Sequence, residues 1–335
     1  MDYVTLGSTG ITVNKNGFGA LPIQRISEDE AAYLLRKAFE NGITFYDTAR
    51  FYTDSEKKIG IALSDVRSRI VIATKTMPQD AQGFREQLET SLSQLNTDYI
   101  DIYQFHNPSF CPKPGDGSGL YEAMLEAKEQ GKLRHIGITN HRLNIALEAA
   151  ASGLYEIIQF PVSYIASDSE LDFVRVCREH DIGVLGMKSL AGGLITNSAA
   201  AYAFSMQYDN LLPIWGIQFE SELDEFISYQ DNPPLLDDDL RLVIEHDIAE
   251  LSGDFCRGCG YCMPCPAKID ISIAARMSLL IRRAPRSMWL NDHWREGMKR
   301  VDDCINCNHC MEHCPYGLDA PKLMRSGWLE YKAFL

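Results

Sequence analysis

The sequence predicts an α/β fold, a (β/α)8 TIM barrel followed by a smaller helical domain. Short apolar runs alternate with helical patterns along the first two-thirds of the chain, and this alternation is typical of a parallel α/β arrangement. The 335 residues exceed the roughly 250 that such a barrel needs. Eight of the ten cysteines lie between Cys256 and Cys314. We therefore expect a barrel domain over residues 1–232 and a second domain over residues 233–335.

The elements of the barrel follow in chain order. Residues 3–14 predict a β-hairpin around a Gly-containing turn. A first helix is expected from Ser27, an N-cap residue followed by acids, to Asn41-Gly42. Further helices are expected near 54–66, 83–95, 118–130, 142–152, 169–180, 197–208 and 220–230. The eight strands are expected near 17–22, 43–46, 71–75, 100–105, 134–138, 156–161, 183–187 and 212–216.

Two segments of the chain are rich in proline. Residues 107–119 also carry several glycines; this loop either covers the mouth of the barrel or is a surface excursion. Residues 230–239 combine proline with acidic residues and predict the linker between the domains. Asp237 begins a predicted helix that runs to Leu251. Two basic, amphipathic patches, 271–283 and 289–300, predict further helices in the second domain.

The composition excludes several classes of function. The formal net charge of −14 argues against binding to nucleic acid or to anionic membranes. No apolar run reaches the roughly 20 residues of a membrane span. The N-terminus lacks the basic start and apolar block of a signal peptide. We expect a cytoplasmic protein without a membrane span.

Four polar side chains follow three successive predicted strands, and they carry the first functional signal. They are Asp47, Tyr52, Lys75 and His106. Side chains just past the carboxyl ends of barrel strands point into a shared mouth. The segments Tyr46-Asp47-Thr-Ala-x-x-Tyr52, Thr74-Lys75 and Gln104-x-His106 resemble the aldo-keto reductase family. The resemblance implies that these four residues form the catalytic tetrad of an oxidoreductase.

The chemistry of carbonyl reduction explains these residue types. A phenol is too weak an acid to protonate an alkoxide unless its anion is stabilised, and a neighbouring ammonium lowers its pKa. Tyr52 is therefore expected to be the general acid/base and Lys75 its electrostatic partner. Asp47 would orient Lys75, and His106 would orient and polarise the substrate carbonyl.

The resemblance also implies a nicotinamide cofactor. Thr139, Asn140 and Gln159 resemble the residues that hold the carboxamide, although turn and capping roles would also explain them. Met187 stands where family members commonly place an aromatic residue that stacks on the nicotinamide. Gly216 and Ser221 complete the expected cofactor contacts, and a helix N-terminus near Ser221 suits a pyrophosphate.

The segment after the eighth strand bears on the choice of cofactor. Members that prefer NADPH usually place Arg or Lys there, whereas this chain has Gln218, Glu220 and Glu222. Carboxylates repel a 2′-phosphate, so the sequence favours NAD(H) over NADP(H). A barrel without a functional nicotinamide site is the alternative.

Two cysteine runs give the strongest signal in the sequence. Both runs follow the C-x2-C-x2-C pattern, and after two or three intervening residues comes a fourth cysteine that precedes proline. In two-cluster ferredoxins the fourth cysteine of each run ligates the other cluster. One [4Fe–4S] cluster is thus expected on Cys256, Cys259, Cys262 and Cys314, and the other on Cys304, Cys307, Cys310 and Cys265. Zinc sites, the alternative, expect separated C-x2-C pairs. The long insert between the runs resembles α-helical ferredoxins.

Three functions remain open on this basis. The first is a nicotinamide-dependent carbonyl reductase or alcohol dehydrogenase acting on a small polar substrate, with clusters that exchange electrons with ferredoxin or another electron-transfer protein. In the second, the clusters drive a reduction or elimination in the barrel without nicotinamide. The third is a non-catalytic electron carrier. We favour the first.

Overall fold

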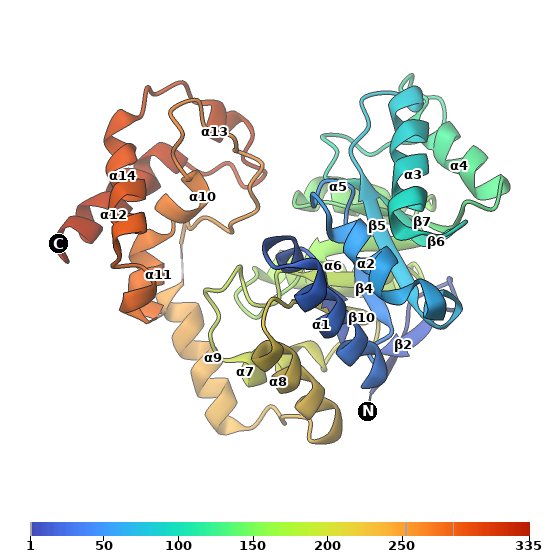
Figure 1. Cartoon of the computed structure of the whole chain (residues 1–335), viewed down its shortest axis with the longest axis horizontal. Helices are drawn as coiled ribbons and strands as arrows, with labels where there is room; N and C mark the ends of the chain where they lie inside the picture. Colours follow the sequence, from blue (N-terminus) through green and yellow to red (C-terminus); the bar gives the residue numbers. More distant parts are fainter. Residues whose placement is uncertain (1, 252, 284) are drawn as a thin grey trace. The chain divides into compact units, whose positions relative to one another are not determined.

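The computed structural model describes residues 2–251, 253–283 and 285–335 (Figure 1). The chain forms two compact units. The first contains the residues up to Ser189 together with Tyr202–Leu236, and the second contains Leu190–Ala201 together with Asp237–Leu335. The predicted linker, 230–239, spans the end of the first unit. Residues 190–201, which follow a barrel strand in the sequence, belong to the second unit.

The first unit is a closed barrel of eight parallel strands, which confirms the predicted fold. Around the barrel the order is β10-β3-β4-β5-β6-β7-β8-β9. The strands are β3 (Gly17–Gly19), β4 (Phe45–Asp47), β5 (Val71–Thr76), β6 (Ile100–His106), β7 (Leu133–Thr139), β8 (Ile157–Pro161), β9 (Gly183–Met187) and β10 (Leu211–Gly216). β3 is shorter than predicted because Pro22 begins a 3-10 helix, η1 (Pro22–Arg25).

Helices alternate with these strands. They are α1 (Glu28–Glu40), α2 (Ser55–Leu63) with the 3-10 turn η2 (Ser64–Arg69), α3 (Ala81–Leu95), α4 (Leu120–Glu129), α5 (Leu143–Ser152), α6 (Asp168–Glu179), α7 (Ser198–Ser205) and α8 (Glu220–Asp231). Ser27 and Glu30 form a capping box at the start of α1, as the sequence predicted. None of the helices in the described part of the chain combines the length and apolar character that a bilayer crossing requires.

A hairpin closes the amino-terminal end of the barrel. β1 (Tyr3–Thr5) and β2 (Thr12–Asn14) pair antiparallel. Val4, Leu6 and Val13 are buried in one apolar cluster with inward side chains of the barrel strands, among them Phe45 and Ile102. This end of the barrel is packed with apolar side chains, which leaves the carboxyl ends of the strands as the place for a site.

The second unit is helical. Its elements are α9 (Asp238–Glu250), α10 (Ile271–Ala274), α11 (Met277–Arg283), η3 (Arg286–Met288), α12 (Asp292–Lys299), η4 (Arg300–Asp303), α13 (His309–Glu312) and α14 (Ala320–Lys332), with α10 to α14 in orange to red in Figure 1. Met277, Met324 and Tyr331 are at the centre of its apolar core. The patch predicted as one helix over 271–283 is divided at Ala275 and Arg276, between α10 and α11.

Candidate functional site

The structure brings the four predicted catalytic side chains together at the carboxyl ends of three adjacent strands. Asp47 is the last residue of β4, Lys75 lies near the end of β5, and His106 is the last residue of β6. β5 pairs with β4 on one side and with β6 on the other. Tyr52 lies in the loop that joins β4 to α2.

Lys75 and Asp47 form a buried ion pair. The Lys75 Nζ lies 2.7 Å from Oδ1 and 2.8 Å from Oδ2 of Asp47. It also donates to the Thr48 carbonyl oxygen at 2.6 Å. These three acceptors match the three N–H groups of an ammonium, so the position of the Lys75 charge is tightly fixed.

Tyr52 packs against both Lys75 and His106. The Lys75 Nζ lies 5.4 Å from the centre of the Tyr52 ring. The rings of Tyr52 and His106 meet edge to face, with centres 5.9 Å apart. Phe51, which is 69% exposed, also contacts His106 edge to face, with its ring centre 6.4 Å from that of the imidazole. A phenol, an ammonium and an imidazole thus share one site.

Burial determines the charges in this site. Burial, and then the positive charge of Lys75, lowers the pKa of His106 to about 3, so His106 is neutral at physiological pH. Burial lowers the pKa of Lys75 and raises that of Asp47, while the attraction between the two charges opposes both shifts. A neutral imidazole beside a fixed ammonium is suited to hydrogen bonding with a carbonyl oxygen.

A second buried carboxylate, Glu56, supports this arrangement and was missed by the sequence analysis. Glu56 accepts a hydrogen bond from Thr74 Oγ1 at 2.6 Å and forms an ion pair with Arg50. Its negative charge also raises the pKa of Lys75. Arg50 in turn donates its backbone N–H to the Lys75 carbonyl oxygen at 2.9 Å. Glu56 falls within α2, where an acid is ordinarily solvent-exposed, so no local pattern indicates that this side chain is buried.

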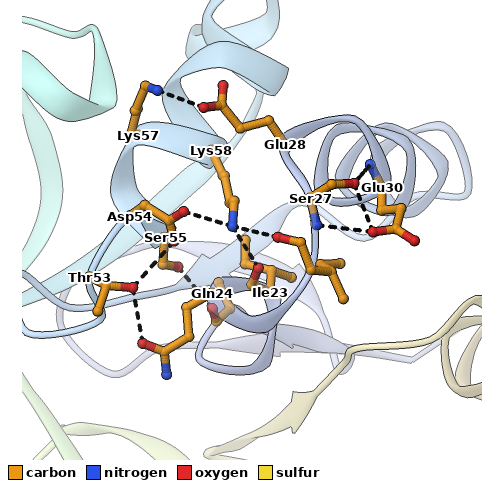
Figure 2. Close-up of polar contacts among 12 residues, drawn as sticks. Ile23, Gln24, Ser27, Glu28, Glu30, Thr53, Asp54, Ser55, Lys57 and Lys58 are labelled. Atoms are coloured by element: carbon orange, nitrogen blue, oxygen red, sulfur yellow. Dashed lines mark hydrogen bonds and ion pairs between the residues drawn. The ribbon is translucent and has the colours of Figure 1, made fainter.

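A buried lysine anchors the loop that carries Tyr52 (Figure 2). The Lys58 Nζ donates to the carbonyl oxygens of Ile23 at 3.0 Å and Ile26 at 2.8 Å, and pairs with Asp54 at 2.8 Å. Thr53 Oγ1 donates to Gln24 Oε1 at 3.2 Å. These bonds join η1, which follows β3, to the segment immediately after Tyr52.

The residues predicted to hold the carboxamide also lie together, and their polar groups have partners within the barrel. Gln159 accepts from Gln104 Nε2 at 3.1 Å and donates to Asp47. Asn140 donates to the Pro108 carbonyl oxygen at 2.8 Å and accepts from the Arg142 backbone N–H at 2.9 Å. The bond to Pro108 ties the 107–119 loop to the end of β7.

Two further predicted cofactor contacts, Thr139 and Met187, close this group. Thr139 Oγ1 lies 3.9 Å from the Met187 sulfur. The pair joins the ends of β7 and β9 beside Gln159, whose backbone carbonyl accepts from the Asn140 N–H at 3.0 Å. Four of the predicted cofactor residues are therefore neighbours at the mouth of the barrel.

The segment after β10 folds back on its own helix. Gly216 ends β10, and Ser221 lies in the first turn of α8. One carboxylate oxygen of Glu222 accepts the backbone N–H groups of Gln218 at 2.8 Å and Phe219 at 2.9 Å. Backbone N–H groups at a helix N-terminus attract anions, and here a side chain of the protein occupies two of them.

Glu220 has a different set of partners from its neighbour Glu222. It pairs with Lys37 at 2.6 Å and accepts a hydrogen bond from Tyr33. Lys37, in α1, also pairs with Asp224 at 2.6 Å. The Lys37 ammonium at the start of α8 is thus paired with two carboxylates, and the exposed Arg25 contacts Gln218 Oε1 at 3.5 Å.

In the second unit, one cavity gathers cysteines from both runs. Its lining includes Cys265 of the first run together with Cys304, Cys307 and Cys310 of the second. Burial raises the pKa of Cys310, and the charges of these same three cysteines raise it further. This is the set that the sequence predicted for one cluster.

The remaining four cysteines are the first three of the first run together with Cys314. Burial raises the pKa of Cys262 to about 12, with further contributions from Cys256 and Cys259. The Arg257 guanidinium lies 4.5 Å from the centre of the Tyr316 ring. This contact brings Tyr316, two residues after Cys314, to the first run, and the exchange of the fourth cysteines stays a prediction.

Comparisons with known proteins agree with both parts of the chain. Residues 15–203 match the model of the Aldo/keto reductase family, and residues 255–319 match that of a 4Fe-4S dicluster domain. L-galactose dehydrogenase of Arabidopsis thaliana is 34% identical over 210 residues, which are 57% of this chain and 66% of that protein. Methylglyoxal reductase YeaE of Escherichia coli is 29% identical over 214 residues, 56% of this chain and 70% of that protein.

Solved structures show the same fold. An aldo-keto reductase from Bacillus halodurans, in its holo form, superposes with a TM-score of 0.65 at 22% identity, over 74% of this chain and 96% of that one. One from Klebsiella pneumoniae, in complex with NADP and acetate, superposes with a TM-score of 0.62 at 21% identity, over 73% and 94%.

Proposed function

This chain belongs to the aldo/keto reductase family and carries a 4Fe-4S dicluster domain, and from that premise we propose that it interconverts a carbonyl and an alcohol on a small polar substrate. Tyr52 acts as the general acid/base, and the clusters relay electrons. The observation that carries the proposal is the convergence of Tyr52, Lys75 and His106 at one strand-end site. Two relatives act, by their names, on L-galactose and methylglyoxal, which favours small polar substrates.

Each residue of the tetrad has a separate role in this proposal. The neutral His106 orients the substrate by a hydrogen bond to the carbonyl oxygen. As a hydride reaches the carbonyl carbon, Tyr52 transfers its proton to that oxygen, and the resulting phenolate is stabilised by the Lys75 ammonium. Asp47 is a positioning residue that keeps Lys75 charged and in place. Oxidation of the alcohol follows the same steps in reverse.

We assign the cluster ligands as the sequence pattern and the cavity suggest. The first cluster is held by Cys256, Cys259, Cys262 and Cys314, and the second cluster by Cys265, Cys304, Cys307 and Cys310. When bound, the clusters exchange electrons one at a time with an electron-transfer protein such as a ferredoxin. Cys310 is buried in the apolar core of this unit, and Cys256, Cys262, Cys265 and Cys304 pack against the same core.

For the hydride donor, the residues of the barrel favour NAD(H) over NADP(H). A bound nicotinamide supplies the hydride. The Glu222 carboxylate occupies the backbone N–H groups of Gln218 and Phe219, and the nearby Lys37 is paired with acids. A 2′-phosphate is disfavoured in this arrangement because it would lie beside the Glu222 carboxylate, although the exposed Arg25 guanidinium also reaches the Gln218 side chain at 3.5 Å.

The test of the proposal is turnover by a Tyr52→Phe chain. Anaerobically purified, cluster-loaded protein is assayed with small aldehydes, ketones and their alcohols. Loss of the proton donor is expected to lower kcat at least about a hundredfold. Tyr3→Phe, a change at an exposed tyrosine of the hairpin at the other end of the barrel, is the control and should leave kcat unchanged. A Tyr52→Phe chain that keeps most of its turnover would exclude Tyr52 as the acid.

A second candidate function rests on the hydrogen bonds that the residues predicted to hold the nicotinamide already make within the protein. Gln159 and Asn140 already have partners on both sides of their amides. In this candidate the clusters reduce a substrate in the barrel directly, without nicotinamide, and the tetrad supplies protons. Calorimetric titration with NADH separates the two. Saturable binding and cluster-independent carbonyl reduction support the first candidate, and turnover only with a one-electron donor supports the second.

A further inference from the structure

A buried arginine lies against the loop of the first cysteine run. Arg276, between α10 and α11, is 7% exposed. Its Nε donates to the Ser272 carbonyl oxygen at 2.8 Å. Its Nη1 donates to the Gly192 carbonyl oxygen at 2.7 Å, and Gly192 belongs to the same unit. A loop and a helix turn thus hold the guanidinium in one position.

The guanidinium packs directly on Gly258, between Cys256 and Cys259. A β-carbon on Gly258 would lie 2.8 Å from the Arg276 Cζ and 2.9 Å from each Nη, so a side chain there would displace the guanidinium. Gly258 also has a positive φ of +61°. Its backbone N–H donates to the Cys256 sulfur at 3.4 Å. A single glycine therefore separates a permanent positive charge from a proposed cluster ligand.

This placement has a consequence for reduction of the cluster. Cysteine thiolates give a [4Fe–4S] site a negative charge, and reduction adds one more. The guanidinium keeps its positive charge at all physiological pH values. Because Arg276 is buried, solvent screens its field less than that of an exposed cation. The positive field of Arg276 stabilises the reduced, more negative state of the cluster more than the oxidised state. The reduction potential of the cluster therefore rises.

We propose that Arg276 is a charge-compensating residue of the first cluster, and that it raises the reduction potential of this cluster by stabilising the reduced state. The inference rests on the proposed ligands of the first cluster. On the other run, Asn306 accepts a hydrogen bond from Arg325, which is exposed. Because Arg276 contacts the first run at Gly258, the second cluster is expected to depend less on Arg276, and it provides an internal reference in the same molecule.

The test is a redox titration of the anaerobic full chain, followed by EPR, for wild type, Arg276→Gln and Arg276→Lys. Arg276→Gln should shift one of two one-electron transitions to lower potential. At its former midpoint the ratio of reduced to oxidised cluster should fall about tenfold, which is about 59 mV. Arg276→Lys, which keeps the charge, should shift the same transition by less than half as much. A Cys307→Ser chain lacks one proposed ligand of the second cluster, so the transition that it alters belongs to that cluster. In the Arg276 variants this transition should keep its wild-type midpoint.

The matched control is Arg282→Gln. Arg282 is exposed, and its Nε donates to the Ser278 carbonyl oxygen at 3.0 Å, the same local bond that Arg276 makes with Ser272. Neither transition should move in this chain. If the Arg276→Gln protein does not retain its iron, the Arg276→His variant is titrated in its place. The transition of the first cluster should then fall in potential as pH rises through the titration of the imidazole, more steeply than in wild type.

Two negative results have different meanings. Wild-type protein without iron and acid-labile sulfide would overturn the proposed ligands themselves. Clusters present in full, with both transitions unchanged in Arg276→Gln or equally shifted in Arg276→Lys, would overturn the role of Arg276 and leave the ligand assignment intact. A pH-independent potential in an iron-loaded Arg276→His chain would do the same.

Discussion

The Lys75 ammonium contacts both carboxylate oxygens of Asp47, at 2.7 and 2.8 Å, inside the barrel. Both side chains are almost fully buried. Removing one partner of a buried pair leaves the other charge without compensation, and this costs roughly 3–5 kcal/mol. The pair is therefore important for stability as well as for catalysis.

Asp47→Asn is expected to lower the free energy of unfolding of the barrel by about 3 kcal/mol and to abolish most of the turnover. The stability loss lies at the low end of the range because Glu56 still acts on the Lys75 charge. Urea unfolding measures the first effect and kcat the second. Asp65→Asn removes an exposed partner of Arg36 and should change stability little. Equal stabilities of the two variants would contradict the buried pair.

His106 makes the stability of the barrel depend on pH. The unfolded chain binds a proton at His106 near pH 6.5, whereas the folded chain, with the pKa lowered to about 3 by burial and by Lys75, does so only at much lower pH. Between these values the unfolded state binds more protons. Stability therefore rises with pH across this window and no longer depends on His106 above it.

Wild-type protein is thus expected to lose up to about 1.4 kcal/mol per pH unit through His106 alone as the pH falls from about 6 to about 4. Urea unfolding at several pH values should show a steeper loss for wild type than for His106→Asn. His246→Asn replaces an exposed histidine of α9 and should retain the wild-type slope. Parallel curves for wild type and His106→Asn would show that His106 is not held neutral.

Lys58 and Lys57 are adjacent lysines with opposite environments. Lys58 is buried, and its ammonium bonds to two carbonyl oxygens and to Asp54. Lys57 instead pairs with the exposed Glu28 at 2.6 Å (Figure 2). Lys58→Met leaves buried acceptors unsatisfied and should lower the free energy of unfolding by about 2–3 kcal/mol. It should also lower kcat, because the loop after Tyr52 loses its anchor. Lys57→Met should change stability by less than about 1 kcal/mol.

These neighbours show how far the sequence could lead. The strand ends of Asp47, Lys75 and His106 were predictable, because a short apolar run locates a strand and a barrel fixes where its end points. The cysteine runs were predictable because ligand spacing is local. Which of Lys57 and Lys58 is buried depends on the packing of η1 against α2, and no local pattern records it. That residues 190–201 belong to the second unit likewise depends on tertiary contacts. The hydrogen bond from Arg276 to the Gly192 carbonyl oxygen could not be predicted for the same reason.

Glu222 is expected to determine the choice of dinucleotide. Glu222→Ala frees the backbone N–H groups of Gln218 and Phe219 and removes a negative charge. The affinity for NADPH relative to NADH should rise by about tenfold, or about 1.4 kcal/mol. Calorimetric titration with both nucleotides measures the ratio. Glu225→Gln, one turn further along α8, where the carboxylate accepts a hydrogen bond from Tyr229, should leave the ratio unchanged. An unchanged ratio in Glu222→Ala would exclude this role.

Removal of iron is expected to unfold the second unit and leave the barrel folded. Three of the four tryptophans, Trp289, Trp294 and Trp328, pack on the apolar core that also contains Cys310 and contacts Cys256, Cys262 and Cys304. Loss of the metal removes the bonds that close this core, and binding free energy at such sites is folding free energy. The fourth tryptophan, Trp215, is buried in the barrel and should keep its environment.

Anaerobic chelation should therefore shift tryptophan emission to longer wavelength and remove most of the near-ultraviolet dichroism. In a Trp215→Phe chain the whole shift should remain, since its tryptophans all lie in the second unit. The urea transition of the barrel, followed by far-ultraviolet dichroism, should keep its midpoint. Retained emission after complete loss of iron would mean that the helices hold their core without metal. A barrel transition that shifts together with the iron content would mean that the two units unfold as one.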